Sequence, residues 1–316
     1  MPGEHEQLRL MAKVARLYHE RGQRQTQIAA ELHVSQARVS RLLKAAAAMG
    51  LVRTIVSMPG GVHTEVEEAL EQRFGLSEAV VAEAEDEAAV IPALGAALAT
   101  YVENTFFSQE VVGISSWSAS LLAMVDALTS LHAGAAKTVV QLVGGHGQSA
   151  VQFQANRLLT RLAALTGAKP VFLSAPGVLL SGADVASLLK APSLAEATTA
   201  WHELTVALLG IGSVEPSPLA RESGNILPEA TLEVLRGQGA VGDICFRYFD
   251  AAGALVSSEL NETVVGISPD DLKRVPRRVG VAGGARKVAA IRAALRGGWV
   301  NVLVTDLATA EALLAV

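Results

Sequence analysis

From about residue 79 onward, short apolar segments alternate with glycine-containing loops and helical stretches. Because helical stretches separate most of the apolar segments, this order predicts an α/β fold: a largely parallel sheet covered by helices on both faces. Such sheets bind ligands at the carboxyl ends of their strands, so the loops there are the candidate site. The predicted strands are residues 79–82, 111–114, 138–142, 170–173, 206–211, 240–246, 263–266, 278–282 and 301–305.

Residues 25–46, QTQIAAELHVSQARVSRLLKAA, have the spacing of a helix-turn-helix. Ala29 is small enough to let the second helix approach the first, and Ser35 is placed to cap the second helix. His33 stands at the turn position where glycine is usual, because that residue often needs a positive φ. Contacts between the two helices are expected from Ile28, Leu32, Val34, Val39, Leu42 and Leu43.

The outer face of the second helix carries side chains suited to DNA. Arginine can donate two hydrogen bonds to guanine, glutamine can pair with adenine, and serine and lysine can contact the backbone. Residues 1–57 hold nine Lys and Arg against four Asp and Glu, whereas the remainder holds 17 against 27. We therefore expect only the N-terminal segment to meet a polyanion, although a helical hairpin with a solvated basic face is the alternative. The candidate DNA-binding residues are Ser35, Gln36, Ala37, Arg38, Ser40, Arg41 and Lys44.

The length of 316 residues suggests about two domains. We predict a winged helix-turn-helix domain at 1–57 with a β-wing at 51–58, a linker at 58–63, and an effector-binding domain at 64–316. No apolar run is long enough to span a membrane and the N-terminus lacks a signal peptide pattern, so we expect a cytoplasmic protein. With Cys245 as the single cysteine, we expect neither a disulfide nor a metal site, and no cofactor.

Five loops that follow predicted strands carry glycine or polar residues: 115–120, 144–149, 175–177, 210–213 and 282–287. In the first, Ser115, Ser116, Ser118 and Ser120 exceed the single serine that a helix cap needs, which favours binding of an anion or of sugar hydroxyls over capping alone.

Lys287 is expected in the first turn of a helix at 284–296, where a cation opposes the helix dipole. A bound phosphate or carboxylate would make this position favourable, and a nearby aspartate or simple solvation is the alternative. Asp243 can accept hydrogen bonds from sugar hydroxyls, with a turn or cap role as the alternative. Gln141 lies within an apolar strand and either points into the cleft or is satisfied in the core.

The sequence supports neither a dinucleotide-binding motif nor a catalytic group. GQGAVG at 237–242 fits a dinucleotide-binding pattern, but it follows a predicted helix and leads into a strand, which inverts the required order. No Ser-His-Asp or Cys-His grouping can be argued, so no catalytic residue is predicted.

The order of the motifs resembles the SorC family of bacterial sugar-responsive transcription regulators, over nearly the whole chain. The resemblance rests on VVGISSWSAS, VVQLVGG, APG, GIGS, GAVGDICFRYFD and GVAGGARKVAAIRAALRGGWVNVLVTD. It implies a Rossmann-like effector domain similar to sugar-phosphate isomerases and glucosamine-phosphate deaminases, used as a sensor. It further implies that the 115–120 loop and Lys287 hold a phosphate or its equivalent, while Gln141 and Asp243 contact the sugar.

The serine loop departs from the GxSWGxT-like pattern of many members. GISSWSAS is one residue longer and has Ser118 and Ser120 in place of the glycine and threonine. A sugar phosphate and an unphosphorylated sugar or polyol therefore both stay open as effectors.

The sequence predicts a homo-oligomeric, non-enzymatic regulator of a carbohydrate or polyol operon that binds operator DNA and a small effector. One alternative is a sugar-phosphate isomerase or deaminase with a regulatory DNA-binding head. A nucleotide-binding switch, based on GQGAVG, is a weaker third.

Overall fold

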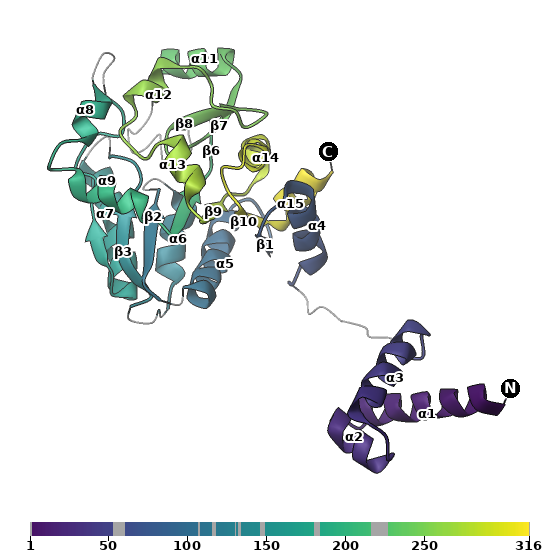
Figure 1. Ribbon diagram of the computed structural model, residues 1–316. Helices are drawn as coiled ribbons and strands as arrows, with labels where there is room; N and C mark the ends of the chain where they lie inside the picture. Colours follow the sequence, from purple (N-terminus) through teal and green to yellow (C-terminus); the bar gives the residue numbers. More distant parts are fainter. Residues whose placement is uncertain are drawn as a thin grey trace. The chain divides into compact units, whose positions relative to one another are not determined.

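The computed structural model describes residues 2–52, 61–106, 108–115, 118–129, 131, 134–145, 149–179, 184–215 and 227–315 (Figure 1). The chain forms two compact units, Met1–Pro59 and Gly60–Val316. Most of the β-wing predicted at 51–58 and part of the predicted linker lie outside the described residues. Among the described residues, no helix is both long and apolar enough to cross a membrane.

The described part of the first unit contains the helices α1 (Pro2–His19), α2 (Gln25–Glu31) and α3 (Gln36–Ala48). Its core is formed by α1 residues such as Val14 together with Ile28 and Val39, which are fully buried. The Ser35 hydroxyl accepts a hydrogen bond from the Arg38 backbone N–H at 3.2 Å, which confirms the predicted cap. His33 has φ of 52°, the positive value expected at the turn.

The second unit is built on a parallel sheet of seven strands in the order β1-β10-β9-β5-β2-β3-β4. Since all pairings are parallel, every strand presents its carboxyl end at the same edge. The strands are β1 (Glu78–Ala82), β2 (Glu110–Ile114), β3 (Ala136–Gln141), β4 (Lys169–Val171), β5 (Val206–Gly210), β9 (Arg277–Val281) and β10 (Val302–Asp306).

Two hydrophobic clusters, one on each face, hold the helices against the sheet. One cluster joins the strands to α5 (Val90–Thr105), α6 (Ala119–Ala127) and α7 (Ser149–Thr166). The other includes side chains of α4 (Thr64–Phe74), α9 (Ala195–His202), α14 (Val288–Arg296) and α15 (Leu307–Leu314), and also of α11 (Glu229–Gly237), which packs on a second, smaller sheet. The other helices among the described residues are short: α8 (Val185–Leu189), α12 (Glu259–Thr263), α13 (Pro269–Arg274) and the 3₁₀ turn η1 (Ala285–Lys287).

The strand predicted at 240–246 forms, but its expected place in the parallel sheet is wrong, and the segment predicted as a strand at 263–266 is not one. The segment predicted at 240–246 is not in the parallel sheet, because β7 (Ala240–Ile244) pairs with β8 (Arg247–Asp250) and with β6 (Gly212–Ser213) in a small antiparallel sheet. The turn between β7 and β8 contains Cys245 and Phe246, both at positive φ, instead of the glycine or asparagine typical of such turns. Residues 263–266 form isolated bridges with the loops after β3 and β4 rather than a strand.

Both edges of the parallel sheet are protected against further strand pairing. Glu67 and Glu71 on α4 accept hydrogen bonds from the backbone N–H groups of Val81 and Ala79, each at 2.9 Å, so α4 satisfies the free edge of β1. The other edge strand, β4, is three residues long and contains Pro170, which has no N–H to offer.

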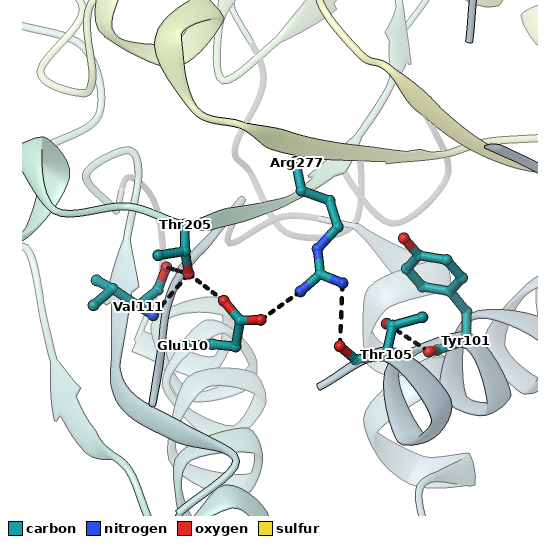
Figure 2. Close-up of polar contacts among 6 residues, drawn as sticks. All are labelled: Tyr101, Thr105, Glu110, Val111, Thr205 and Arg277. Carbon is teal, nitrogen blue, oxygen red and sulfur yellow. Dashed lines mark hydrogen bonds and ion pairs between the residues drawn. The ribbon is translucent and has the colours of Figure 1, made fainter. Parts of the chain in front are cut away.

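A polar network closes the amino-terminal edge of the sheet (Figure 2). The Arg277 guanidinium donates to the Glu110 carboxylate at 2.8 Å and to the Thr105 carbonyl at 3.2 Å. The Thr205 hydroxyl donates to Glu110 and accepts from the Val111 backbone N–H. These contacts tie α5, β2, β5 and β9 together on the side of the sheet opposite the predicted ligand loops.

Candidate functional site

At the carboxyl edge the fold brings Asp243 and Lys287 together around the chain that leaves β5. The Lys287 ammonium donates to the Ile211 carbonyl at 2.8 Å, and Gly212 pairs with Asp243 across β6 and β7. A Cβ placed on Gly212 would lie 2.0 Å from Asp243 Oδ1, so the carboxylate rests directly on this glycine. Residues distant in sequence thus form one local group of opposite charges.

Burial dominates the electrostatics of this pair. It raises the pKa of Asp243 to about 6, against the opposing influence of the Phe246 N–H, which donates to the carboxylate at 3.1 Å, and of the Lys287 charge. Burial also lowers the pKa of Lys287, and Asp243 opposes that shift. Both residues are half-buried, so burial disfavours both charges, and the hydroxyl or phosphate oxygens of a ligand have suitable hydrogen-bond partners here.

The helix position predicted for Lys287 needs correction. Residues 285–287 form the 3₁₀ turn η1, and α14 begins at Val288, so Lys287 occupies the position just before the helix, where its side chain makes no capping hydrogen bond. Its side chain turns back to Ile211 and Asp243. The nearby aspartate that was one explanation for a cation at this place is therefore present.

The serine loop adjoins the same strand end. The Ser115 hydroxyl accepts from the Gly210 N–H at 2.8 Å, and the Ser118 hydroxyl accepts from the Leu121 N–H at 3.3 Å as the cap of α6. A Cβ on Gly210 would lie 2.7 Å from that of Ser118, which places the loop against the end of β5. Ser120 is buried in α6, and Ser116 lies outside the described residues.

Gln141 occupies a buried position between strands. Its side-chain oxygen accepts from the Leu173 backbone N–H at 2.8 Å, and its backbone carbonyl accepts from the Trp201 indole N–H at 2.8 Å. Both contacts hold the chain after β4 and helix α9 to β3. This is the arrangement expected of a polar residue satisfied within the core.

Two residues near the site were missed in the sequence. Phe246 donates its backbone N–H to Asp243 from a left-handed conformation, and nothing in the letters ICFR marks that turn. Arg247 is buried and donates to the Asn261 carbonyl, which anchors the hairpin to the segment that bridges the loops after β3 and β4. Its signal was a charged residue inside the apolar run CFRYF.

In the first unit, the predicted DNA-contacting face of α3 is open to solvent. Gln36, Ala37, Arg38, Arg41 and Lys44 are exposed, and Ser40 is half-buried. Ser35 is exposed, with its hydroxyl engaged in the cap. Across the described part of the chain, no group of three or more His, Cys, Asp or Glu side chains could hold a metal ion.

A family model described as a putative sugar-binding domain matches residues 61–315. The sorbitol operon regulator of Klebsiella pneumoniae is 30% identical over 313 residues, covering 97% of this chain and 98% of that protein. The deoxyribonucleoside regulator of Bacillus subtilis is 32% identical over 313 residues, with 98% of each chain covered.

The chain belongs to the SorC family of sugar-binding transcriptional regulators. The crystal structure of full-length SorC from Klebsiella pneumoniae matches it with a TM-score of 0.72 and 29% identity over 98% of this chain and 99% of that chain. A sugar-binding domain from Pseudomonas syringae matches with a TM-score of 0.62 and 36% identity, covering 80% of this chain and 99% of that chain. All candidate effector residues of this SorC-family chain lie within the matched sugar-binding domain.

Proposed function

We propose that this chain regulates a carbohydrate or polyol catabolic operon by binding operator DNA, and that a sugar, polyol or sugar phosphate in the second unit changes its affinity for that DNA. The observation that carries the proposal is the Asp243–Lys287 pair beside Gly212, at the carboxyl edge where parallel sheets bind ligands. The names of the relatives, a sorbitol operon regulator and a deoxyribonucleoside regulator, support an effector of this class.

Each group at the site has a chemical role in this proposal. The Asp243 carboxylate accepts hydrogen bonds from sugar hydroxyls, and the Lys287 ammonium donates to hydroxyl or phosphate oxygens. The serine loop lies beside Gly210, one residue before the carbonyl that Lys287 contacts, and would receive the phosphate or the equivalent end of a polyol. Gln141 would act indirectly, by holding the chain after β4.

A thermal-shift panel tests the effector half of the proposal. We expect stabilisation by at least one member of the set sorbitol, sorbitol 6-phosphate, ribose and ribose 5-phosphate, since a ligand at 100 times its dissociation constant adds about 2.7 kcal/mol to the folded state. A response to the phosphates alone identifies a phosphate site, and a response to the parent compounds identifies a polyol site. If no member of this panel or of a wider sugar and sugar-phosphate set shifts the midpoint, the effector assignment fails.

Within this proposal the second unit senses its ligand without converting it. Isomerisation or deamination of a sugar phosphate needs positioned acid and base groups, and likeness of fold does not carry an activity. Incubation of the protein with pentose and hexose phosphates should give no product. Steady turnover that disappears on Asp243→Asn would favour an enzyme.

The DNA half of the proposal places α3 in the major groove, with two or more copies of the chain matching operator half-sites in the cytoplasm. Arg41→Ala should weaken binding to operator DNA at least about tenfold while leaving effector affinity unchanged, because a fork of hydrogen bonds to a base is lost. Arg9→Ala on α1 removes the same charge, and we expect it to weaken operator binding less than Arg41→Ala does. Equal effects of the two substitutions would remove Arg41 from the recognition face.

A further inference from the structure

The loop that carries Lys287, residues 282–287, is held in place by Asp306, the last residue of β10, and by Thr309 in the first turn of α15. The Gly284 backbone N–H donates to Asp306 Oδ2 and to the Thr309 hydroxyl, each at 2.9 Å. Asp306 Oδ1 accepts from the Thr309 N–H at 3.0 Å and caps α15. Asp306 and Thr309 are both buried, so these hydrogen bonds are shielded from water.

The loop and the carboxylate fit each other closely. A Cβ on Gly283 would lie 2.2 Å from Asp306 Oδ2, and Gly284 has φ of 90°, with a Cβ there 2.5 Å from Glu87 Oε1. A side chain at Gly283 would collide with Asp306, and one at Gly284 would be strained at this positive φ. The two glycines and Asp306 therefore fix one path for the chain between β9 and η1.

That path determines where Lys287 lies. The Gly284 carbonyl accepts from the Lys287 backbone N–H at 3.0 Å, and the Lys287 ammonium then reaches the Ile211 carbonyl at 2.8 Å. A displacement of Gly284 away from Asp306 would shift the start of η1 and, with it, the backbone from which the Lys287 ammonium reaches Ile211 and Asp243.

The geometry points to Asp306 as a positioning residue of the effector site: it holds the 282–287 loop so that the Lys287 ammonium stands beside Asp243. This inference rests on the proposed function. Both carboxylate oxygens of Asp306 are occupied by backbone N–H groups, so the residue acts through the loop without touching the effector. Thr309 shares the task through the second acceptor for Gly284.

Substitutions can separate the two roles of Asp306: the hydrogen bond to Gly284, which we call the tether, and the cap of α15. In Asp306→Ser, the serine hydroxyl still caps α15 but is too short to reach Gly284. Thr309→Val removes the other acceptor with nearly the same shape, and Thr309→Ser restores it. Asp184→Ser provides a matched control, since Asp184 caps α8 through the Ser187 N–H at 2.9 Å and α8 lies well away from α14 and α15 in Figure 1.

The experiment measures, on the full chain, the dissociation constant of the panel compound that stabilises the parent most, by titration calorimetry. We expect Asp306→Ser to weaken it about tenfold, since a hydrogen bond to a carboxylate fixes the loop. Thr309→Val should weaken it less, Thr309→Ser should restore parent affinity, and operator affinity without effector should not change.

Three results would overturn the inference. Parent-like affinity in Asp306→Ser would reduce Asp306 to a helix cap. Equal losses in Asp306→Ser and Asp184→Ser would indicate a general cost of changing a cap. If Asp306→Ser does not fold, equal affinity of Thr309→Val and Thr309→Ser decides against the tether. A parent protein that binds no panel compound is a different outcome, because it contradicts the proposed function itself and the inference with it.

Discussion

At the scale of single residues, Asp243 and Lys287 lie in a partly buried place that disfavours both charges. The pKa of Asp243 is raised to about 6 and the pKa of Lys287 is lowered, both chiefly by burial. A left-handed turn at Cys245 and Phe246 adds backbone strain next to Asp243. Such features lower stability and are typical of sites whose ligand supplies the missing interactions.

The raised pKa of Asp243 predicts that this side chain lowers the free energy of unfolding as the pH rises. Its value in the unfolded chain is about 3.9, so the folded state holds this proton more tightly, and the resulting stabilisation is complete below about pH 4 and lost as pH rises through about 6. Asp243→Asn should therefore stabilise the unliganded protein at pH 7, by up to about 3 kcal/mol, and have little effect at pH 4. Denaturant unfolding at the two pH values measures this.

The three tryptophans, Trp117, Trp201 and Trp299, all lie in the second unit, so their fluorescence reports that unit alone. Asp270→Asn, at an exposed position on α13, serves as the control. The pKa assignment fails if Asp243→Asn gives the same change in unfolding free energy at both pH values.

The close contact between Gly212 and Asp243 allows a steric test of the same site. Gly212→Ala should lower effector affinity at least about tenfold, because the new methyl group must displace the Asp243 carboxylate, 2.0 Å away. Gly237→Ala at the end of α11 is the matched control, since a Cβ there meets nothing within 4 Å. Calorimetry on both variants decides: similar affinities would show that Asp243 is not held against Gly212 in solution.

At the scale of elements, the sequence predicted the strands that are buried on both faces. The apolar run at 111–114 corresponds to β2 (Glu110–Ile114), and the run at 278–282 corresponds to β9 within one residue. It gave the wrong pairing for 240–246, which is a strand of the antiparallel sheet, and the wrong element for 263–266, because apolar segments look alike whether they pair in parallel, in a hairpin or as single bridges.

For the candidate site too, the sequence indicated single residues but not how they pair. Asp243 and Lys287 stood out singly, since each is unusual for its neighbours, but their pairing depends on β6 lying against β7, and the two residues of β6 gave no strand signal. Asp306 and Thr309 escaped notice because an aspartate three residues before a threonine at a helix start reads as an ordinary cap. Their second role depends on Gly284, distant in sequence.

The contact between helix α4 and the edge of β1 should contribute to the stability of the second unit. Glu71→Ala removes the acceptor of the Ala79 N–H at the edge of β1 and should cost about 1–3 kcal/mol of unfolding free energy. Glu71→Gln keeps an acceptor and removes a like charge that raises the pKa of Glu78, so it should cost less. Tryptophan-monitored denaturation compares the two, and equal losses would show that the charge, and not the edge contact, matters.

At the scale of the whole molecule, a basic three-helix unit and an acidic α/β unit share one chain. In the proposed function they are coupled only through free energy: an effector changes operator affinity by the ratio of its affinities for the two forms, and the operator changes effector affinity by the same factor. The proposal includes an oligomer, which would make this coupling effective, because recognition helices must match half-sites at a fixed spacing.

The most direct test of this account titrates the protein with operator DNA, obtained by selection from a random library, with and without the panel compound that stabilises it most. The account predicts that a saturating effector changes the operator dissociation constant by a factor of about 5 to 150, and that Lys287→Ala abolishes the change while its affinity for DNA alone is kept. An operator affinity that is identical with and without a bound effector would contradict it.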